Sequence, residues 1–352
     1  MDDKHYCMSS YLALKYIESD NKDFGRNFKH NNYTPPLDGE RIMVSSASEI
    51  DKAIQLQLSA YQGKKVGVFL SGGMDSAIVA SYLPGTDAYT FRYIGIDYPD
   101  DELRRAELFA NYYGLNLHYV DISWESMIRH LDPLMINKAC PVYYIEPQLH
   151  QAALQAKADG VEIIMVGEGS DLVFGGLSWL LSKDWTVDEF ERVYTSTFPK
   201  MVLRHGVSLR DVFDRYRLNN DKIDYLHFLE DIFCIEAYTA YENAFSVAGV
   251  PYFDPFERLK MASSLDIGRV RNGEAKYLIR ELYALRYPTL PIPEKIRLPN
   301  PLDSYLKDWP GPCRHEFLPN LNMAAFRGKH KWQLFCLERF LNIMDSKPQY
   351  AE

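Results

Sequence analysis

The sequence lacks the patterns that mark several large classes of protein. Its five cysteines are scattered and form no Cys-x-x-Cys pair, so neither a disulfide framework nor a zinc site is indicated. No apolar run approaches the roughly 18 residues of a membrane span, and no charged-then-apolar signal follows Met1. These absences predict a protein of the reducing cytoplasm without a membrane partner.

An excess of positive charge is missing as well. The chain has 39 Lys and Arg against 48 Asp and Glu, a net charge of −9, so no basic face for nucleic acid is expected. Hydrophobic residues make up 47% of the 352 positions, which indicates a globular chain of one large or two modest domains. We therefore expect small-molecule substrates and no nucleic-acid partner.

Apolar strand-type runs alternate with helical patterns in the first half of the chain. Strands are predicted at 65–70, 88–93, 115–120 and 162–166, and the helices between them at 75–82, 101–113 and 147–158. This βαβ alternation predicts an α/β fold with a doubly wound parallel sheet. Ligands of such sheets bind at the carboxyl ends of the strands.

Composition divides the chain into three segments. Residues 1–47 form an N-terminal extension, 48–185 an α/β core, and 186–352 a mainly helical region in which the strand signal disappears after about residue 180. A helix is predicted at 48–61, with Ser48 as its cap and Asp51 three residues on. Tyr and Phe recur at helical spacing after residue 186 and are expected to be core rather than ligand platforms.

A glycine loop follows the first strand of the core. Residues 66–76 read VGVFLSGGMDS, an apolar strand that runs into a Gly-Gly turn and then a helix. Backbone amides and hydroxyls at such a helix start favour a phosphate chain. The predicted phosphate-binding residues are Ser71, Gly72, Gly73, Asp75 and Ser76.

An aspartate in this loop predicts a metal ion. Asp75 would repel bound phosphates unless a divalent cation lay between them, which implies Mg²⁺. A second apolar strand ends in Gly167-Glu-Gly-Ser-Asp171, and Asp171 is the natural second metal ligand because both motifs sit at strand carboxyl ends. The alternative is that Ser170 or Asp171 caps a short helix.

The first loop has no lysine and so differs from the Walker-type loop; it resembles the loop of the ATP-pyrophosphatases, which cleave ATP between the α and β phosphates. Together with the second motif it resembles the synthetase domain of the asparagine synthetase and β-lactam synthetase family. The resemblance covers about residues 50–180 and returns in 250–305. It implies a PP-loop fold of the adenine nucleotide alpha hydrolase type, with ATP and Mg²⁺ bound, and a ligase that adenylates a carboxylate and transfers it to ammonia or an amine.

The same resemblance assigns roles to further residues. Glu168 would line the reacting centre near the nitrogen nucleophile, Lys276 would stabilise charge on the α-phosphate and the acyl oxygen, and Lys295 would bind pyrophosphate. For Glu168 the alternative is a loop carboxylate that only bonds backbone amides, and for either lysine a solvated side chain. The adenine pocket would use strand-end residues, here Phe69, Leu70, Tyr93, Val166 and Gly167.

The chain also departs from that family. Residue 2 is Asp and only 70 residues precede Ser71, so no room is expected for a glutaminase domain with a cysteine nucleophile. The nitrogen source would be ammonia, ammonia from a separate glutaminase subunit, or an amine. The segment 247–254 lacks the family's Glu and Arg, and an Arg-x-Asp is replaced around Glu236 and Tyr238.

These losses fall where the acyl substrate would lie, so the acid would be aspartate-like, a specialised metabolite or a sugar acid. Two other readings remain open. One is a PP-loop enzyme that modifies tRNA, which the acidic balance and the missing cysteine pair disfavour. The other is a non-catalytic nucleotide-binding protein, which the intact Asp75, Asp171 and Lys276 disfavour.

Overall fold

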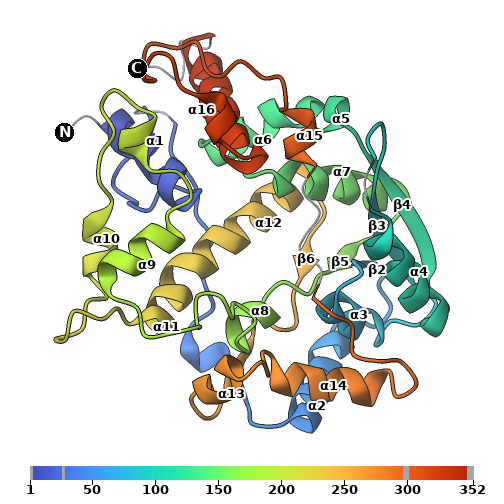
Figure 1. Cartoon of the computed structure of the whole chain (residues 1–352). Helices are drawn as coiled ribbons and strands as arrows, with labels where there is room; N and C mark the ends of the chain where they lie inside the picture. Colours follow the sequence, from blue (N-terminus) through green and yellow to red (C-terminus); the bar gives the residue numbers. More distant parts are fainter. Residues whose placement is uncertain (1–2, 26–27, 98, 296–300, 347–352) are drawn as a thin grey trace.

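A computed structural model describes residues 3–25, 28–97, 99–295 and 301–346. Its main sheet has five parallel strands in the order β4-β3-β2-β5-β6 (Figure 1). They are β2 (Val66–Phe69), β3 (Asp87–Tyr93), β4 (Asn116–Ile122), β5 (Ile163–Met165) and β6 (Tyr252–Phe253). The four strands predicted in the first half of the chain and their parallel pairing are confirmed.

Helices surround this sheet and form a second, largely helical part. The α-helices up to the end of the second glycine motif are α1 (Asp3–Leu14), α2 (Ala47–Ser59), α3 (Met74–Ala80), α4 (Asp101–Tyr113), α5 (Trp124–Arg129), α6 (Leu131–Lys138), α7 (Ile145–Ala158) and α8 (Ser170–Val173). Those that follow are α9 (Val187–Tyr194), α10 (Arg210–Asp214), α11 (Tyr225–Phe228), α12 (Cys234–Ala248), α13 (Ile267–Arg271), α14 (Tyr277–Arg286), α15 (Leu302–Tyr305) and α16 (Gly328–Ser346). Short helical turns are η1 (Asp38–Glu40), η2 (Pro199–Met201), the π-helical η3 (Leu229–Phe233) and η4 (Met323–Ala325).

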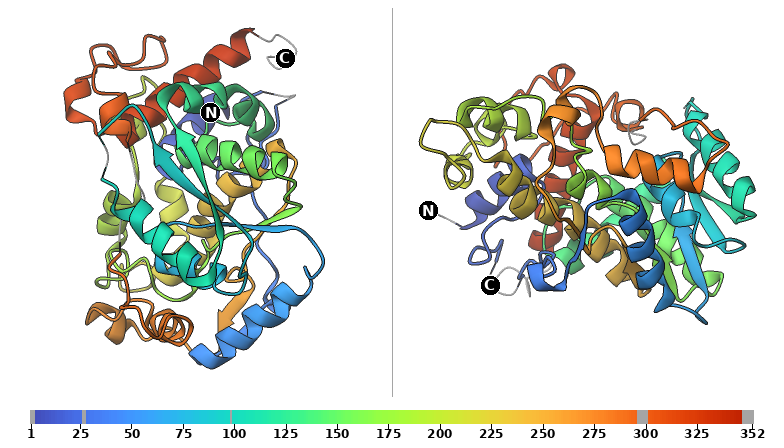
Figure 2. Two further views of the ribbon diagram at one scale, coloured as in Figure 1. Left: turned by 90° about the vertical axis from the view of Figure 1, so that its right-hand side faces the viewer. Right: turned by 90° about the horizontal axis from the view of Figure 1, so that it is seen from below.

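The sheet is covered on both faces, as a doubly wound fold requires. Along β5, Ile163 and Met165 join the core formed with α2, α3, α4 and α14, whereas Ile164 joins the core formed with α6, α7, α12 and α16. Successive side chains of a strand point to opposite faces, so an all-apolar strand is the pattern of a sheet buried on both sides. Figure 2 shows α14 (orange) beside α2 (blue) in further views.

Three short strands lie where the sequence predicts none. β6 adds to β5 at the sheet edge, and β1 (Ile42–Val44) pairs in parallel with β7 (Leu259–Met261) in a separate two-stranded sheet. The expectation that strands end after about residue 180 is therefore wrong. Strands of two or three residues are too short to show a period of two, so the sequence carries no signal for them.

The start of α2 also differs from the prediction. Its cap is Ser46, whose hydroxyl accepts the Glu49 backbone N–H at 3.3 Å, while the Glu49 carboxylate accepts the Ser45 N–H at 2.7 Å. Ser48 lies inside the helix and is exposed. The prediction of Ser48 as the cap is wrong by two residues because several Ser-x-x-acid spacings overlap here.

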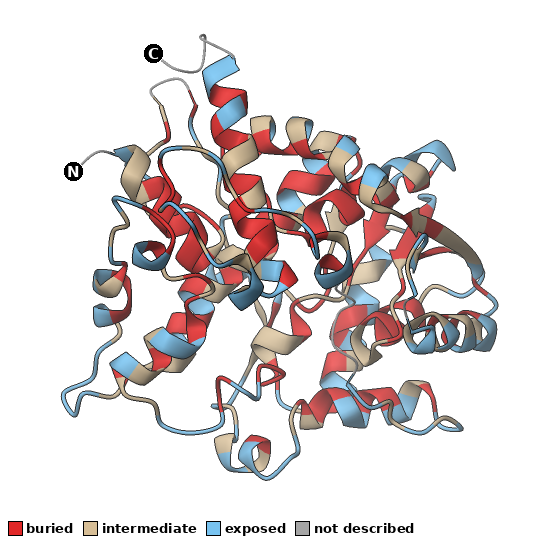
Figure 3. Cartoon of the chain, turned by 45° about the horizontal axis from the view of Figure 1, so that its top comes forward, coloured by how far each residue is buried: buried red, intermediate tan, exposed pale blue. Residues whose placement is uncertain are grey.

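The first and last helices pack into the core. The Gln333 amide on α16 donates to the carbonyl oxygens of Tyr11 and Leu12 on α1, and the Trp332 indole donates to the Val142 carbonyl at 3.1 Å. Figure 3 shows the buried residues gathered where the helices meet one another and the sheet. Among the described helices, none combines the length and apolar character that crossing a bilayer demands.

Most aromatic side chains after residue 186 are core, as predicted. Phe190, Phe213 and Phe228 are fully buried and stack in a third core between α9, α10 and α11. Phe233 and Tyr241, however, line the large cavity described next. Both also pack against core residues, so the prediction of core aromatic residues holds for them while they contribute to the cavity wall as well.

Candidate active site

A cavity of about 920 Å³ opens at the carboxyl ends of β2 and β5. From β2 the chain crosses to β3 on one side, whereas β5 lies on the other side, so the strand order reverses at this point. In open α/β sheets the loops at such a reversal diverge and leave a crevice for ligands. Residues of both glycine motifs line this cavity, so the two motifs lie together in the structure.

The first glycine loop is held by its own hydroxyls. Ser76 Oγ accepts the Ser71 N–H at 3.0 Å and lies 2.8 Å from Ser71 Oγ, which in turn accepts the Gly73 N–H at 3.1 Å. Ser71, Gly73 and Ser76 line the cavity, as does Asp75. Gly72 does not line it; it lies against α4, where an added Cβ would stand 2.6 Å from the Glu102 carbonyl oxygen.

The second glycine loop is fastened by Asp254, which the sequence did not single out as a site residue. Asp254 is fully buried, and its Oδ2 accepts the Glu168 and Gly169 N–H groups at 2.9 and 2.7 Å and the Tyr238 hydroxyl at 2.8 Å. Burial raises the pKa of Asp254 to about 6, against the lowering effect of these hydrogen bonds. The end of β6 thereby positions the loop that carries Glu168 and Asp171.

Lys276 lies at the centre of the charged groups of the site. Its Nζ donates to Asp75 Oδ2 at 2.6 Å and to Ser170 Oγ at 2.9 Å, and it also contacts Asp171 Oδ1. Ser170 Oγ in turn donates to Asp75 Oδ1 at 2.5 Å. Burial alone would lower the pKa of Lys276, but the charges of Asp75 and Asp171 outweigh it and the pKa lies above the usual value.

The backbone of Lys276 is strained. At the N-cap of α14 it adopts φ of 57°, a left-handed conformation that costs a non-glycine residue about 1–2 kcal/mol. Strain of this kind concentrates at functional sites because the surrounding structure holds it in place. Here the strain aims a buried ammonium at two carboxylates.

Space around this cluster is tight. At Gly176 an added Cβ would lie 1.8 Å from Asp171 Oδ1 and 2.1 Å from Lys276 Cε, so only glycine fits. Lys295, which is 61% exposed, donates to Asp171 Oδ2 and to the Gly176 carbonyl, both at 3.0 Å. Burial would raise the pKa of Asp171, but Lys276 and Lys295 together hold it below its usual value. Residues 296–300, which follow Lys295, lie outside the described residues.

Glu168 faces the cavity in partnership with Tyr241. The Tyr241 hydroxyl on α12 donates to Glu168 Oε2 at 2.9 Å. Burial raises the pKa of Glu168 to about 7, with the charges of Asp171 and Asp254 adding to the rise and the Tyr241 hydrogen bond opposing it. A carboxyl group with a pKa near 7 can hold or release a proton at neutral pH. The sequence offered no signal for Tyr241, since a tyrosine on a helix is core by default.

Most of the residues predicted for the adenine pocket lie together at the cavity. Phe69, Leu70, Val166 and Gly167 line the cavity. Tyr93 does not; its hydroxyl donates to Gln148 Oε1 at 2.7 Å instead. Glu102, on the first turn of α4, lines the cavity without having been predicted, and burial raises its pKa to about 7.

The two aspartates fit one kind of metal site. In the described part of the chain no group of three or more His, Cys, Asp or Glu side chains converges. Asp75 and Asp171 nevertheless contact the same ammonium group, so their oxygen atoms converge on one small cation. Two carboxylates suit Mg²⁺ that takes its other ligands from phosphates and water, and they do not suit an all-protein metal cage.

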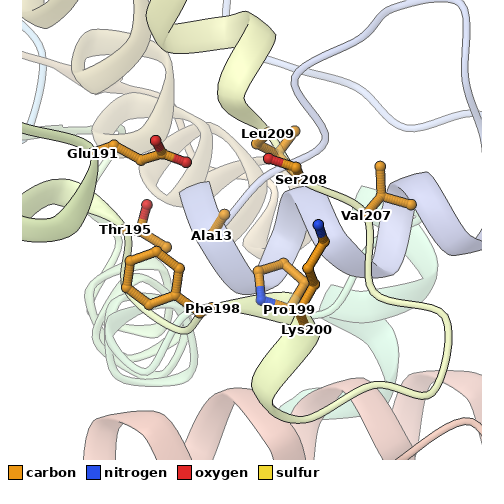
Figure 4. Close-up of a pocket in the computed structure, with 9 residues that line it drawn as sticks. All are labelled: Ala13, Glu191, Thr195, Phe198, Pro199, Lys200, Val207, Ser208 and Leu209. Carbon is orange, nitrogen blue, oxygen red and sulfur yellow. The ribbon is translucent and has the colours of Figure 1, made fainter. Parts of the chain in front are cut away.

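A second hollow lies near the first. It has about 60 Å³ between α1, α9 and η2 and is lined mainly by apolar groups, among them Phe198, Pro199 and Leu209 (Figure 4). A water molecule takes up roughly 30 Å³ of liquid, so this hollow is too small for a nucleotide or an organic acid. The large cavity is therefore the candidate active site.

Comparison with known proteins gives a consistent result. Asparagine synthetase B of Escherichia coli (strain K12), described as glutamine-hydrolyzing, is 24% identical over 198 residues, 48% of this chain and 34% of that protein. The glutamine-hydrolyzing asparagine synthetase of Sandersonia aurantiaca is 32% identical over 132 residues, 31% of this chain and 23% of that protein. The chain thus spans about a third or less of the length of these relatives.

Among solved structures, the U34-tRNA thiolase NcsA from Methanococcus maripaludis matches with a TM-score of 0.33 and 12% identity, over 85% of this chain and 80% of that one. A superposition this weak supports no statement about function. The family model of asparagine synthase, in contrast, matches residues 46–236, which is more than half of the chain and includes both glycine loops. This protein therefore belongs to the asparagine synthase family.

Proposed function

We propose that this protein is an ATP-dependent, AMP- and pyrophosphate-forming ligase that activates a carboxylate and transfers the acyl group to ammonia or an amine. One observation carries the proposal: Lys276 contacts both Asp75 and Asp171 inside a cavity at the carboxyl ends of β2 and β5. Two carboxylates can hold a divalent cation on the phosphates of ATP, and a fixed ammonium can stabilise the charge that develops at the α-phosphate. Membership of the asparagine synthase family supports the same reaction class.

The phosphate side of the site would bind Mg²⁺–ATP. Asp75 and Asp171 would hold Mg²⁺, which when bound would neutralise the charge of the departing pyrophosphate. Ser71, Gly73 and Ser76 would contact the phosphates, and Lys295 would pair with pyrophosphate in place of Asp171. Lys276 would move from its two aspartates toward the α-phosphate as negative charge develops there.

The reaction would have two steps. In the first, a substrate carboxylate oxygen forms a bond to the α-phosphorus and the bond from that phosphorus to the bridging oxygen breaks, which releases pyrophosphate and leaves an acyl-adenylate. In the second, a nitrogen nucleophile bonds to the acyl carbon, AMP leaves, and the nitrogen loses a proton. Glu168, hydrogen-bonded to Tyr241, would take that proton.

The nitrogen donor separates two versions of the proposal. If ammonia is the nucleophile, ammonium salts should support turnover at a rate that climbs with pH as NH₃ replaces NH₄⁺. A separate glutaminase subunit could then supply it. If an amine is the nucleophile, turnover should require that amine and be indifferent to ammonium.

Product analysis tests the proposed function. With ATP labelled at the α-phosphate, Mg²⁺, a panel of carboxylic acids and either an ammonium salt or an amine, labelled AMP and unlabelled pyrophosphate should form only when an accepted acid is present. Asp75→Asn and Asp171→Asn should each lower this rate by roughly 100-fold or more, because one ligand of the metal is lost. Asp184→Asn, which changes an exposed carboxylate paired with Arg271, is the matched control and should leave the rate unchanged. Formation of ADP and phosphate instead of AMP would refute the proposal.

A further inference from the structure

Part of the cavity is lined by α12 and by the turn before it, and we call this part the second lobe. Its lining residues are Phe233, the last residue of η3, and Glu236, Ala237, Ala240 and Tyr241 of α12, which follow Phe233 at three, four, seven and eight residues. Ammonia is the size of a water molecule, about 30 Å³, and small-molecule sites of roughly 300–1,000 Å³ hold whole organic ligands. With about 920 Å³ in all, the cavity has room for a sizeable organic substrate beside the nucleotide.

The far end of this lobe carries a pair of opposite charges. Lys15 Nζ contacts Glu236 Oε1 and lies 5.3 Å from the centre of the Tyr143 ring, while the Tyr194 hydroxyl donates to Glu236 Oε2 at 2.8 Å. The side chains of Lys15 and Glu236 are 19% and 8% exposed, and both line the cavity. An ammonium has three donors and a carboxylate about four acceptor positions, so each group retains bonding capacity toward a ligand.

Local backbone geometry brings both charges to this place. Lys15 follows the last residue of α1 with φ of 67°, a left-handed conformation that glycine would adopt without cost. On the other side, the π-helical turn η3 directly precedes α12 and ends at Phe233. Insertions of this kind in a helix occur frequently at functional sites because they redirect side chains.

The positions of Glu236 and Tyr241 on α12 set the scale of the lobe. Glu236 and Tyr241 are five residues apart on α12, or about 7.5 Å along the helix axis at about 1.5 Å per residue. Between them, the small side chains of Ala237 and Ala240 leave room beside the helix. The rings of Tyr143 and Phe233 add apolar surface to the cavity wall. The Tyr241 end adjoins Glu168 and therefore the reacting centre.

From these contacts we infer that the acid adenylated by this protein is an amino acid whose reacting carboxyl group lies at the end of a long apolar or ring-bearing side chain. Its ammonium pairs with Glu236, its α-carboxylate pairs with Lys15, and its body lies over Ala237 and Ala240. A neutral pair of opposite charges matches a zwitterion better than it matches a simple anion. The inference rests on the proposed function and names its substrate class.

Aspartate is too short for this arrangement. Its side-chain carboxyl carbon is two C–C bonds from the α-carbon, at most about 2.5 Å given bonds of about 1.52 Å. It would reach either the charged pair or the reacting centre, but would not reach both. A side chain such as that of 2-aminopimelate or 4-carboxyphenylalanine spans the lobe.

Pyrophosphate exchange into ATP measures the adenylation step without any nitrogen donor. The panel is aspartate, glutamate, 2-aminopimelate and 4-carboxyphenylalanine, with pentanoate and 4-methylbenzoate as counterparts that lack the amino-acid head group. We expect the two long amino acids to stimulate exchange roughly tenfold or more above aspartate and above their counterparts, since two charged hydrogen bonds are lost in each case. The inference would be overturned if aspartate were the best substrate, or if the counterparts without the head group stimulated exchange as strongly as the long amino acids.

Variants locate the effect. Lys15→Met should remove the preference for the head group, and the double change of Lys15→Met with Glu236→Gln should do the same without leaving an unpaired carboxylate. Lys52→Met, on the exposed side of α2, is the matched control. Ala237→Leu should block the long acids, whereas Ala237→Ser should not; unchanged exchange in Ala237→Leu would place the acid elsewhere.

Binding separates this inference from the proposed function. Calorimetry with 2-aminopimelate and 4-carboxyphenylalanine, in the presence of ATP analogue and Mg²⁺, should show binding to the wild-type chain and loss in Lys15→Met. Binding without any exchange would count against the ligase reaction while leaving the substrate class supported. Exchange with aspartate alone would leave the ligase reaction supported and refute the substrate class.

Discussion

Lys276 combines a strained backbone, a buried ammonium and two carboxylate partners. Its charge lies between Asp75 and Asp171, the two residues that would hold Mg²⁺ in the proposed function. Under the proposed function, Lys276 would compensate the charges of the two aspartates until Mg²⁺ and ATP bind and would then contact the α-phosphate. Ser170, which bonds to both Asp75 and Lys276, keeps the groups aligned.

Removal of the Lys276 ammonium should affect the chemical step more than ATP affinity. Lys276→Ala should lower kcat roughly 100-fold or more with only a severalfold change in KM for ATP, because its partner is charge that develops during adenylation. Lys276→Arg should restore only part of kcat, since a planar guanidinium group replaces a compact ammonium group. Steady-state kinetics decide the matter: a large rise in KM at constant kcat would show that Lys276 only binds substrate.

The raised pKa of Glu168 should appear in both activity and stability. Burial holds the pKa of Glu168 near 7 against an ordinary value of 4.5, so the folded protein binds more protons than the unfolded chain between these values. Its contribution to the free energy of unfolding is therefore present below about pH 4.5 and lost as pH rises through 7. Activity should rise over the same range, because only the deprotonated carboxylate accepts a proton.

The Glu168→Gln variant tests the predicted direction of this pH dependence. The variant should be nearly inactive yet more stable than the wild type at pH 8, by roughly 1–3 kcal/mol at about 1.36 kcal/mol for each pKa unit. Denaturation at pH 5 and pH 8 measures the difference, which should be small at pH 5. If the variant is less stable than the wild type at pH 8, the folded protein stabilises the ionised form of Glu168, which would contradict the raised pKa.

At the scale of elements, the site depends on where each loop is fastened. Asp254 at the end of β6 accepts four hydrogen bonds, three of them from backbone N–H groups of Glu168, Gly169 and Phe256. Two residues of β6 are thus enough to fix the second glycine loop against the sheet. The sequence does not reveal this pairing, because Asp254 lies 86 and 85 residues from its partners Glu168 and Gly169 in the chain.

Asp254→Asn should loosen that loop. An amide retains one acceptor oxygen where the carboxylate offers two, so at least one buried N–H group loses its partner, at a cost of about 1–3 kcal/mol. We expect reduced kcat and a lower melting temperature together. Hydrogen exchange at Glu168 and Gly169 should rise more than exchange at the first glycine loop; equal protection in both loops would contradict the positioning role.

The cap of α2 offers a test outside the active site. Ser46→Ala should cost about 1 kcal/mol of stability because a helix N–H loses its side-chain acceptor. Ser48→Ala, two residues on and exposed, should change stability by less than about 0.5 kcal/mol. Equal effects of the two substitutions in chemical denaturation would contradict the assignment of Ser46 as the cap of α2.

At the scale of the whole molecule, distant segments share one core. The core on the α7 side of the sheet contains residues of α1, α6, α7, α12 and α16, so both ends of the described chain contribute to it. Trp332 on α16 is its largest fully buried side chain and bonds to the loop before α7. The helices that line the active site are thus stabilised by residues from both termini.

Trp332→Ala should therefore destabilise the molecule as a unit. Loss of a buried tryptophan costs about 3–5 kcal/mol, whereas Trp179→Ala, at a tryptophan that is 52% exposed, should cost far less. Unfolding followed by far-UV circular dichroism and by tyrosine fluorescence should give coincident transitions, since one core links the segments. Separate transitions would show that α16 unfolds on its own.

The sequence by itself determined the parallel sheet, the two glycine loops and the charged residues between them. Each of these is a local pattern: an apolar strand, a glycine turn and a helix start lie within about fifteen residues, and the physics of strand burial and phosphate binding acts at that range. Asp75 and Asp171 could be found in this way. The roles expected of Glu168, Lys276 and Lys295 came only from the family resemblance.

Only the tertiary structure decided what surrounds those residues. Tyr241, Asp254 and Lys15 carry no local signal, because a helical tyrosine, an aspartate after a short strand and a lysine at a helix end have many uses. Their roles depend on partners 73, 86 and 221 residues away in the chain. Packing of α1 and α12 around the cavity, which no periodicity encodes, places them at the site.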